Sequence, residues 1–277
     1  MGCNCYSFRI PLPYHKNISA ICMTPSNKFE DFVELISVLR RECPWDRKQT
    51  HHSIKENLIE EAYEAVEAIE DEDYDDLSKE LGDLLLHVVF HSKMAAENDH
   101  FTIDDVIYRI SEKLIRRHPH VFDNVDVENE KEVASNWETI KLSEGRESIL
   151  DGIPGHLPGL IKAQRMQQKA ANVGFDWHKW ELAWEKLNEE IDEWREAVES
   201  QDAEKRADEF GDLLFSLVNV GRLLDLNAED SIRKTNKKFE SRFRYIEKEL
   251  KSRNKSLNDS NLEEMDELWN EAKNKSN

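Results

Sequence analysis

Pairs of acidic residues at helical spacing recur in this chain and could together bind a metal ion. A Glu-Glu-x-x-Glu motif at residues 60–64 is followed by Glu-x-x-Asp at residues 80–83. Both motifs return 129 residues later, at residues 189–193 and 209–212. Side chains three residues apart share one face of a helix, so each motif would present two carboxylates together. Clustered carboxylate oxygens are hard ligands that suit Mg²⁺ or Mn²⁺, and these ions also bind phosphates.

The spacing of the motifs predicts how these carboxylates meet. The two motifs of the first half are symmetric about residue 72, and those of the second half about residue 201. If the chain forms a helical hairpin that turns at each point, four carboxylates meet at one level between two helices. The predicted ligands are Glu61, Glu64, Glu80 and Asp83 in the first half and Glu190, Glu193, Glu209 and Asp212 in the second.

An alternative is that these acidic residues form an ordinary solvated helix face, since 58 of the 277 residues are Asp or Glu. Apolar residues such as Ala65, Leu84 and Val88 lie beside the motifs, however, and would bury part of this surface. Two like charges about 4 Å apart repel by roughly 4 kcal/mol at an effective dielectric constant of about 20. Four carboxylates held together would need a cation, which favours the metal sites.

Helical periodicity extends over almost the whole chain and predicts an all-α fold. One helix is expected to begin at Asn27 with Glu30 as its capping-box partner, and another at Thr102 with Asp105 in the same role. The second of these should end before Pro119. Further helices are expected at residues 58–69, 77–89, 133–140, 160–172, 178–200, 202–226, 228–252 and 260–273.

Glycine and proline cluster in one segment, residues 143–160, which holds four of the nine glycines and two of the seven prolines. Because these residues interrupt helices, we expect the segment to link an N-terminal domain at residues 23–142 to a C-terminal domain at residues 161–277. Residues 1–22 are expected to be an N-terminal extension, either a disordered arm or an addition from an upstream start codon.

The composition excludes several classes of function. A net charge of −20 would repel the phosphate backbone of nucleic acids. The longest apolar stretch, Leu84–Phe90, has seven residues, which is too short to span a membrane. The four cysteines all lie within the first 43 residues and cannot form a disulfide framework, so we expect a reduced, cytoplasmic protein.

The carboxylate pattern resembles the metal signature of the all-α nucleoside triphosphate pyrophosphohydrolases, and its duplication in one chain resembles the MazG family. Further stretches extend the resemblance over nearly all of residues 23–277. They are Cys43–Asp46 (CPWD), Arg116–Phe122 (RRHPHVF), Asn172–Trp177 (NVGFDW) and Lys238–Phe243 (KFESRF). The resemblance implies a Mg²⁺-dependent homodimer that hydrolyses nucleoside triphosphates between the α- and β-phosphates and removes aberrant or surplus nucleotides.

The resemblance also implies nucleotide-binding residues. Lys186, Lys238, Arg242 and Trp269 match family positions that contact the nucleotide. Lys186 lies one helical turn before Glu190, where its ammonium group could reach a phosphate. The alternative is that the basic side chains extend into solvent and that Trp269 belongs to the core.

Two further pairs of residues are given roles. Arg116 and Arg117 are expected to contact phosphate, although they could simply place positive charge at the end of a helix. Glu189 and Glu60 adjoin the predicted ligands without being among them. We expect these two glutamates to hold or deprotonate the attacking water.

The helix that carries Asp83 is apolar over more than one face and must be buried by another surface. Packing between the repeats or a second subunit could cover it, and the family precedent favours a homodimer. His87 and His91, one turn apart on this helix, mimic a zinc pair. Their apolar surroundings favour a core or interface role instead.

Two hypotheses of function follow from different classes. The first is a Mg²⁺-dependent nucleoside triphosphate pyrophosphohydrolase, and a specialised dUTP or phosphoribosyl-ATP hydrolase is its nearest rival among enzymes. The second is a helical nucleotide-sensing or partner-binding regulator without significant turnover. If the protein is an enzyme, we expect the C-terminal site to carry most of the turnover, because Asn57 stands where the second half has Lys186.

Overall fold

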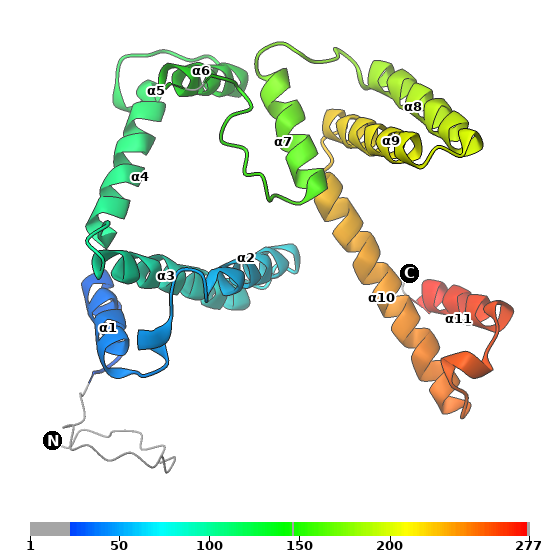
Figure 1. The fold of residues 1–277 in the computed structure, drawn as a ribbon, viewed down its shortest axis with the longest axis horizontal. Helices are drawn as coiled ribbons and strands as arrows, with labels where there is room; N and C mark the ends of the chain where they lie inside the picture. Colours follow the sequence, from blue (N-terminus) through cyan, green and yellow to red (C-terminus); the bar gives the residue numbers. More distant parts are fainter. Residues whose placement is uncertain (1–22, 146, 276–277) are drawn as a thin grey trace. The chain divides into compact units, whose positions relative to one another are not determined.

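The computed structural model describes residues 23–145 and 147–275, in which every regular element is helical (Figure 1). The elements are α1 (Phe29–Glu42), η1 (Asp46–Lys48), α2 (Lys55–Glu70), α3 (Tyr74–Ala96), α4 (Ile103–Arg117), α5 (Pro119–Phe122), α6 (Glu130–Ser143), α7 (Gly159–Ala171), α8 (Trp180–Ser200), α9 (Ala203–Leu223), α10 (Ala228–Ser252), η2 (Leu257–Asp259) and α11 (Leu262–Lys275). The expected all-α fold is confirmed. The predicted extension, residues 1–22, lies outside the described residues.

The chain divides into two compact units after Arg116. In the first unit, α3 packs against both α1 and α2. Ile36 of α1 and Val89 and Phe90 of α3 belong to the buried core of this unit. The predicted linker at residues 143–160 lies within the second unit, and its role as a domain boundary stays a prediction. Across the described residues, no helix combines the length and hydropathy that crossing a bilayer requires.

The second unit repeats the three-helix arrangement of the first, since α9 packs against both α7 and α8. α9 begins 129 residues after α3. The helices that carry the acidic motifs are therefore separated in sequence by the same number of residues as the motifs themselves. α10 continues from α9 and packs against α11, and Ile246, Leu250 and Leu268 are buried between these two helices (Figure 1). The Lys169 ammonium group donates a hydrogen bond of 2.6 Å to the Ile149 carbonyl, which ties the segment before α7 to that helix.

Both predicted hairpins are present. Residues 71–73 join α2 to α3, and Glu72 takes a left-handed conformation with φ 55°. Gln201, with φ 60°, makes the corresponding turn between α8 and α9. The side chains of Asp73 and Asp202 cap the helices that follow by accepting hydrogen bonds from backbone amides of the first turn. These turns place the acidic motifs of each unit on two packed helices.

The start of α1 differs from the prediction. The helix begins at Phe29 without a side-chain cap. Ser26, one residue before Asn27, donates its hydroxyl to the Asp31 carboxylate at 2.6 Å. The expected capping box of Asn27 and Glu30 is therefore wrong, because the N-cap is Lys28, one residue later than the motif implies.

The start of α4 agrees with the prediction. The Thr102 amide donates to the Asp105 carboxylate at 2.8 Å, and the Asp105 amide donates to the Thr102 hydroxyl at 3.3 Å. This reciprocal pair satisfies two amides that have no partner inside the helix. The helix ends at Arg117, two residues before Pro119, as expected.

Candidate metal centre

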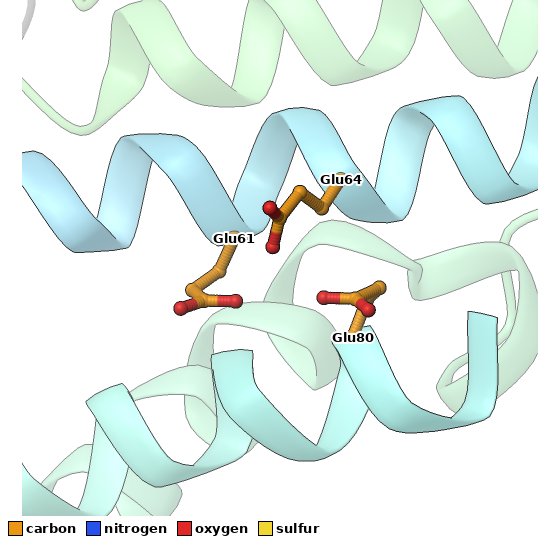
Figure 2. A group of neighbouring side chains, drawn as sticks. All are labelled: Glu61, Glu64 and Glu80. Atoms are coloured by element: carbon orange, nitrogen blue, oxygen red, sulfur yellow. The ribbon is translucent and has the colours of Figure 1, made fainter. Parts of the chain in front are cut away.

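Three carboxylates of the first unit converge between α2 and α3 (Figure 2). Glu61 and Glu64 extend from α2, and Glu80 extends from α3 toward them. One carboxylate oxygen of each residue lies within 4.8 Å of the other two. Asp83, the fourth predicted ligand, is not part of this closest group, but its charge acts on Glu61. We call these four residues the first carboxylate cluster.

In the first carboxylate cluster, burial and neighbouring acids act together on two glutamates. Burial raises the pKa of Glu61, and the charges of Asp83 and Glu64 raise it further. Burial also raises the pKa of Glu80, followed by the charge of Glu64. The Oε2 atom of Glu80 is buried and has no hydrogen-bond partner among the described residues. A raised carboxyl pKa marks a poorly stabilised negative charge, so the donor set fits a hard divalent cation.

The second unit forms the corresponding group. Glu190 and Glu193 of α8 and Glu209 of α9 each place one carboxylate oxygen within 4.8 Å of the other two. Asp212, on α9 one turn after Glu209, again lies outside the closest group. We call these four residues the second carboxylate cluster. Its oxygen-only donors fit the same kind of cation as those of the first.

Lys186 distinguishes the second carboxylate cluster from the first. Its Nζ atom lies 2.8 Å from a Glu189 oxygen and 2.9 Å from a Glu190 oxygen. These hydrogen bonds, with Glu189 contributing most, raise the pKa of Lys186. Burial raises the pKa of Glu193, while the positive charge of Lys186 opposes that rise. Lys186 therefore places a permanent cation beside a buried carboxylate, since the Glu190 side chain is 7% exposed.

The predicted water-binding glutamates are not members of the closest groups, and the paired arginines bind other acidic residues. Glu60 and Glu189 are both exposed, and Glu189 accepts the hydrogen bond from Lys186. Arg116 forms an ion pair with Glu112 inside α4. Arg117 forms an ion pair with Glu144, at the end of α6. The structure thus gives both arginines acidic partners of their own.

Lys238, Arg242 and Trp269 lie on α10 and α11, away from α8 (Figure 1). The Arg242 guanidinium is 5.3 Å from the centre of the Trp269 ring, and Phe239 packs against the same ring at 5.1 Å. Trp269 also packs on the buried core between α10 and α11. Among the described residues, no hydrogen bond, ion pair or ring contact joins these three side chains to the second carboxylate cluster. Their nucleotide contacts stay a prediction.

The structure also identifies residues that the sequence analysis missed. His51 joins the predicted histidine pair, with its Nδ1 atom 2.8 Å from Nδ1 of His91. His87 is buried and also stacks with His91. In the second unit, Gln167 and Asn219 are buried polar residues near Lys186. The sequence signal that could have identified Gln167 and Asn219 is a polar residue on a helix face that is otherwise apolar.

The comparison with known families agrees with the repeated geometry. The family described as "MazG nucleotide pyrophosphohydrolase domain" matches the chain twice, at residues 49–122 and 180–246. The chain belongs to the MazG family. Each matched segment of this MazG protein contains one complete carboxylate cluster, and the predicted family resemblance is confirmed.

Two MazG relatives align over most of the chain. An Escherichia coli (strain K12) protein named "Nucleoside triphosphate pyrophosphohydrolase" is 46% identical over 239 residues, which cover 83% of this chain and 90% of the relative. A Thermotoga maritima protein named "Nucleoside triphosphate pyrophosphohydrolase/pyrophosphatase MazG" is 44% identical over 250 residues, which cover 88% of this chain and 95% of the relative. The similarity therefore includes both units and both clusters.

Proposed function

We propose that this protein hydrolyses nucleoside triphosphates to nucleoside monophosphate and pyrophosphate, and that it uses Mg²⁺ or Mn²⁺ to do so. The observation that carries the proposal is the pair of carboxylate clusters in a chain of the MazG family. The names of the aligned relatives describe the same activity. Removal of aberrant or surplus nucleotides is the role that we propose for it in the cell.

The carboxylates would hold the cation against the triphosphate. We assign this role to Glu190, Glu193, Glu209 and Asp212 in the second unit and to Glu61, Glu64, Glu80 and Asp83 in the first. When bound, a divalent cation polarises phosphate oxygens and lowers the pKa of a coordinated water. The carboxylates themselves would fix the position of the ion and offset its positive charge.

Lys186 and Glu189 would act on the substrate and the water. If Glu190 holds a cation, its ion pair with Lys186 would weaken, and the ammonium group would then be available to a phosphate oxygen. There it would stabilise the negative charge that develops on the triphosphate. Glu189, once it loses the hydrogen bond from Lys186, can accept a proton from the attacking water. Glu60 takes the corresponding place in the first unit.

We further propose a homodimer, with nucleotide contacts from Lys238, Arg242, Trp269, Arg116 and Arg117 as the resemblance implies. Apolar side chains of both hairpins remain exposed in the described chain, among them Leu81, Leu85 and Val88 of α3 and Phe210, Leu214 and Leu217 of α9. A second copy would cover such faces. We also propose a cytoplasmic location, with which the free thiol of Cys43 agrees.

The proposed reaction is tested by its products. Purified protein with Mg²⁺ and a panel of nucleoside triphosphates should release pyrophosphate and the monophosphate, resolved by anion-exchange chromatography. Orthophosphate and the diphosphate as products would contradict the proposal. Glu190→Gln should abolish turnover if the protein is an enzyme. The regulator hypothesis would hold instead if the wild type releases no pyrophosphate and Glu190→Gln leaves the binding of nucleotides or of a partner unchanged.

A further inference from the structure

Three histidines of the first unit gather beside α3. His87 and His91 stand one turn apart on that helix, and His51 belongs to the segment between η1 and α2. The Nδ1 atoms of His51 and His91 lie 2.8 Å apart, and the two rings stack with an interplanar angle of 14°. Two ring nitrogens from segments 40 residues apart in the chain therefore face each other.

Both facing nitrogens can supply a lone pair. A neutral imidazole carries its hydrogen on only one of its two nitrogens, so the other nitrogen is free to accept. Burial lowers the pKa of His91, and the neighbouring rings of His51 and His87 lower it further. The His91 ring is thus neutral at neutral pH, which is the form of histidine that binds metal ions.

The segment before α2 is fixed next to α3. The Arg40 side chain is buried and donates a hydrogen bond of 3.1 Å to the Gln49 carbonyl. Its Nε atom donates at 2.9 Å to the carboxylate of Glu97, the residue that follows α3. The Thr50 amide donates to the Ser53 hydroxyl at 2.9 Å, and the Ser53 amide donates to the Thr50 hydroxyl at 3.2 Å. These bonds hold the backbone on both sides of the loop histidine.

The separation of the two nitrogens is close to that of two ligands on one ion. Zn–N bonds of about 2.0–2.1 Å in a tetrahedral site place two ligating nitrogens about 3.4 Å apart. His51 is exposed, so a small rotation of its ring can open the separation of 2.8 Å to this value. The remaining positions around the ion would be taken by water.

This pair is separate from the first carboxylate cluster. His91 lies eight residues after Asp83 on α3, which corresponds to about 12 Å along the helix axis. The donors differ as well, because imidazole nitrogen suits Zn²⁺ and carboxylate oxygen suits Mg²⁺. The second unit lacks the pair, since at the displacement of 129 residues Trp180 takes the place of His51 and Val220 that of His91.

We propose that His51 and His91, which we call the histidine pair, form a binding site for Zn²⁺. The hydrogen between the two Nδ1 atoms would shift to the Nε2 atom of its own ring, so both imidazoles stay neutral when the ion binds. The ion would join the segment before α2 to α3. The inference is independent of the proposed hydrolysis, because neither histidine has a role in that reaction.

The test is zinc binding in the presence of excess Mg²⁺, which occupies the carboxylates. All chains carry Cys3→Ser and Cys5→Ser, so that two thiols close in sequence do not compete for zinc. Competition with a zinc-chelating dye should show one bound Zn²⁺ per chain. His51→Gln should weaken its binding by at least about tenfold, since even the loss of a residue behind a metal ligand costs that much.

His52→Gln, the same change at the next residue, is the control and should leave the affinity unchanged. Equal affinities of His51→Gln and His52→Gln would overturn the inference, as would a parent chain that binds no zinc. His51 is exposed, so its replacement should not impair folding, which circular dichroism checks. His91→Gln is the second variant and should weaken zinc binding to the same extent.

X-ray absorption at the zinc edge identifies the ligands. The parent chain should show imidazole nitrogen at about 2.0–2.1 Å, with a weaker imidazole signal in His51→Gln. A shell of oxygen without imidazole would place the ion on carboxylates, and sulfur at about 2.3 Å would place it on a cysteine; either result would overturn the histidine pair. Pyrophosphate release is not measured here, so failure of this inference and failure of the proposed function are distinguishable.

Discussion

Lys186 is the residue that most clearly separates the two carboxylate clusters. It bonds to Glu189 and Glu190, whereas Asn57 occupies the corresponding place in the first unit. The pKa of Glu61 in the first cluster is raised by burial and by neighbouring acids, with no lysine to oppose it. Both clusters have the donors for a cation, but among the described residues a lysine bonds to a cluster carboxylate only in the second.

We therefore expect the second cluster to carry most of the turnover. Glu193→Ala should remove nearly all pyrophosphate release, because it deletes a cation ligand beside Lys186. Glu64→Ala, the matched change in the first cluster, should leave much of it. Steady-state kinetics with Mg²⁺ measures both. Equal losses would mean that the two sites are coupled, and the reverse order would show that the first cluster is the working one.

The three stacked histidines of the first unit predict a dependence of stability on pH. Burial lowers the pKa of His87 and, together with His51 and His87, that of His91. An unfolded histidine has a pKa of about 6.5, so the unfolded chain binds these protons first as the pH falls. The free energy of unfolding should therefore decrease as the pH is lowered through about 6.5 and toward the folded-state values.

Urea unfolding without divalent cations measures this effect between about pH 7.5 and about pH 5.5, a range that spans the pKa of an unfolded histidine. His91→Gln should flatten the decrease, because it removes one of the perturbed groups. His100→Gln changes an exposed histidine outside the stack and is the control. If His91→Gln leaves the pH dependence as steep as in the wild type, the stack does not cause it.

At the scale of elements, the hairpin turns determine whether the acidic motifs face each other. Gln201 ends α8 in a left-handed conformation that costs a residue with a Cβ atom more than it costs glycine. Gln201→Gly should therefore raise the free energy of unfolding by up to about 1 kcal/mol. Glu196→Gly, in the exposed interior of α8, should lower it by about 1 kcal/mol. Chemical denaturation measures both, and a destabilised Gln201→Gly would contradict the argument.

At the scale of the whole molecule, exposed apolar faces predict self-association. Leu81, Leu85 and Val88 of α3 are 54%, 41% and 43% exposed. A helix with apolar side chains on several faces is stable in water when another surface covers it. We expect light scattering to give the mass of two 32.5 kDa chains at micromolar concentration.

Leu85→Glu should shift this equilibrium toward single chains, because it places a charge on the apolar face. Leu262→Glu changes a side chain that is 77% exposed on α11 and should leave the mass unchanged. A wild-type mass of one chain at micromolar concentration would refute the dimer.

Local sequence signals determined the elements of this protein. Helical periodicity, the two hairpin turns and the Thr102 cap all follow from residues that are near one another in the chain, so they could be predicted without a structure. The symmetry of the motifs about residues 72 and 201 likewise predicted which carboxylates would meet, because residues equally far from a hairpin turn lie level on its two helices. Three of the four predicted carboxylates form the closest group in each unit, and Asp83 and Asp212 lie outside it. The capping box expected at Asn27 was wrong because the start of α1 depends on how the preceding chain enters the helix.

The tertiary structure alone decided what surrounds the carboxylates. His51 meets His91 across 40 residues of sequence, and Gln167 bonds to Phe215 across 48. Such contacts depend on how α7 packs against α9 and how the segment before α2 folds onto α3, which no local pattern encodes. The buried oxygen of Gln167 that has no hydrogen-bond partner among the described residues also depends on tertiary packing. Residue type alone does not predict it, because packing against distant helices removes the atom from water.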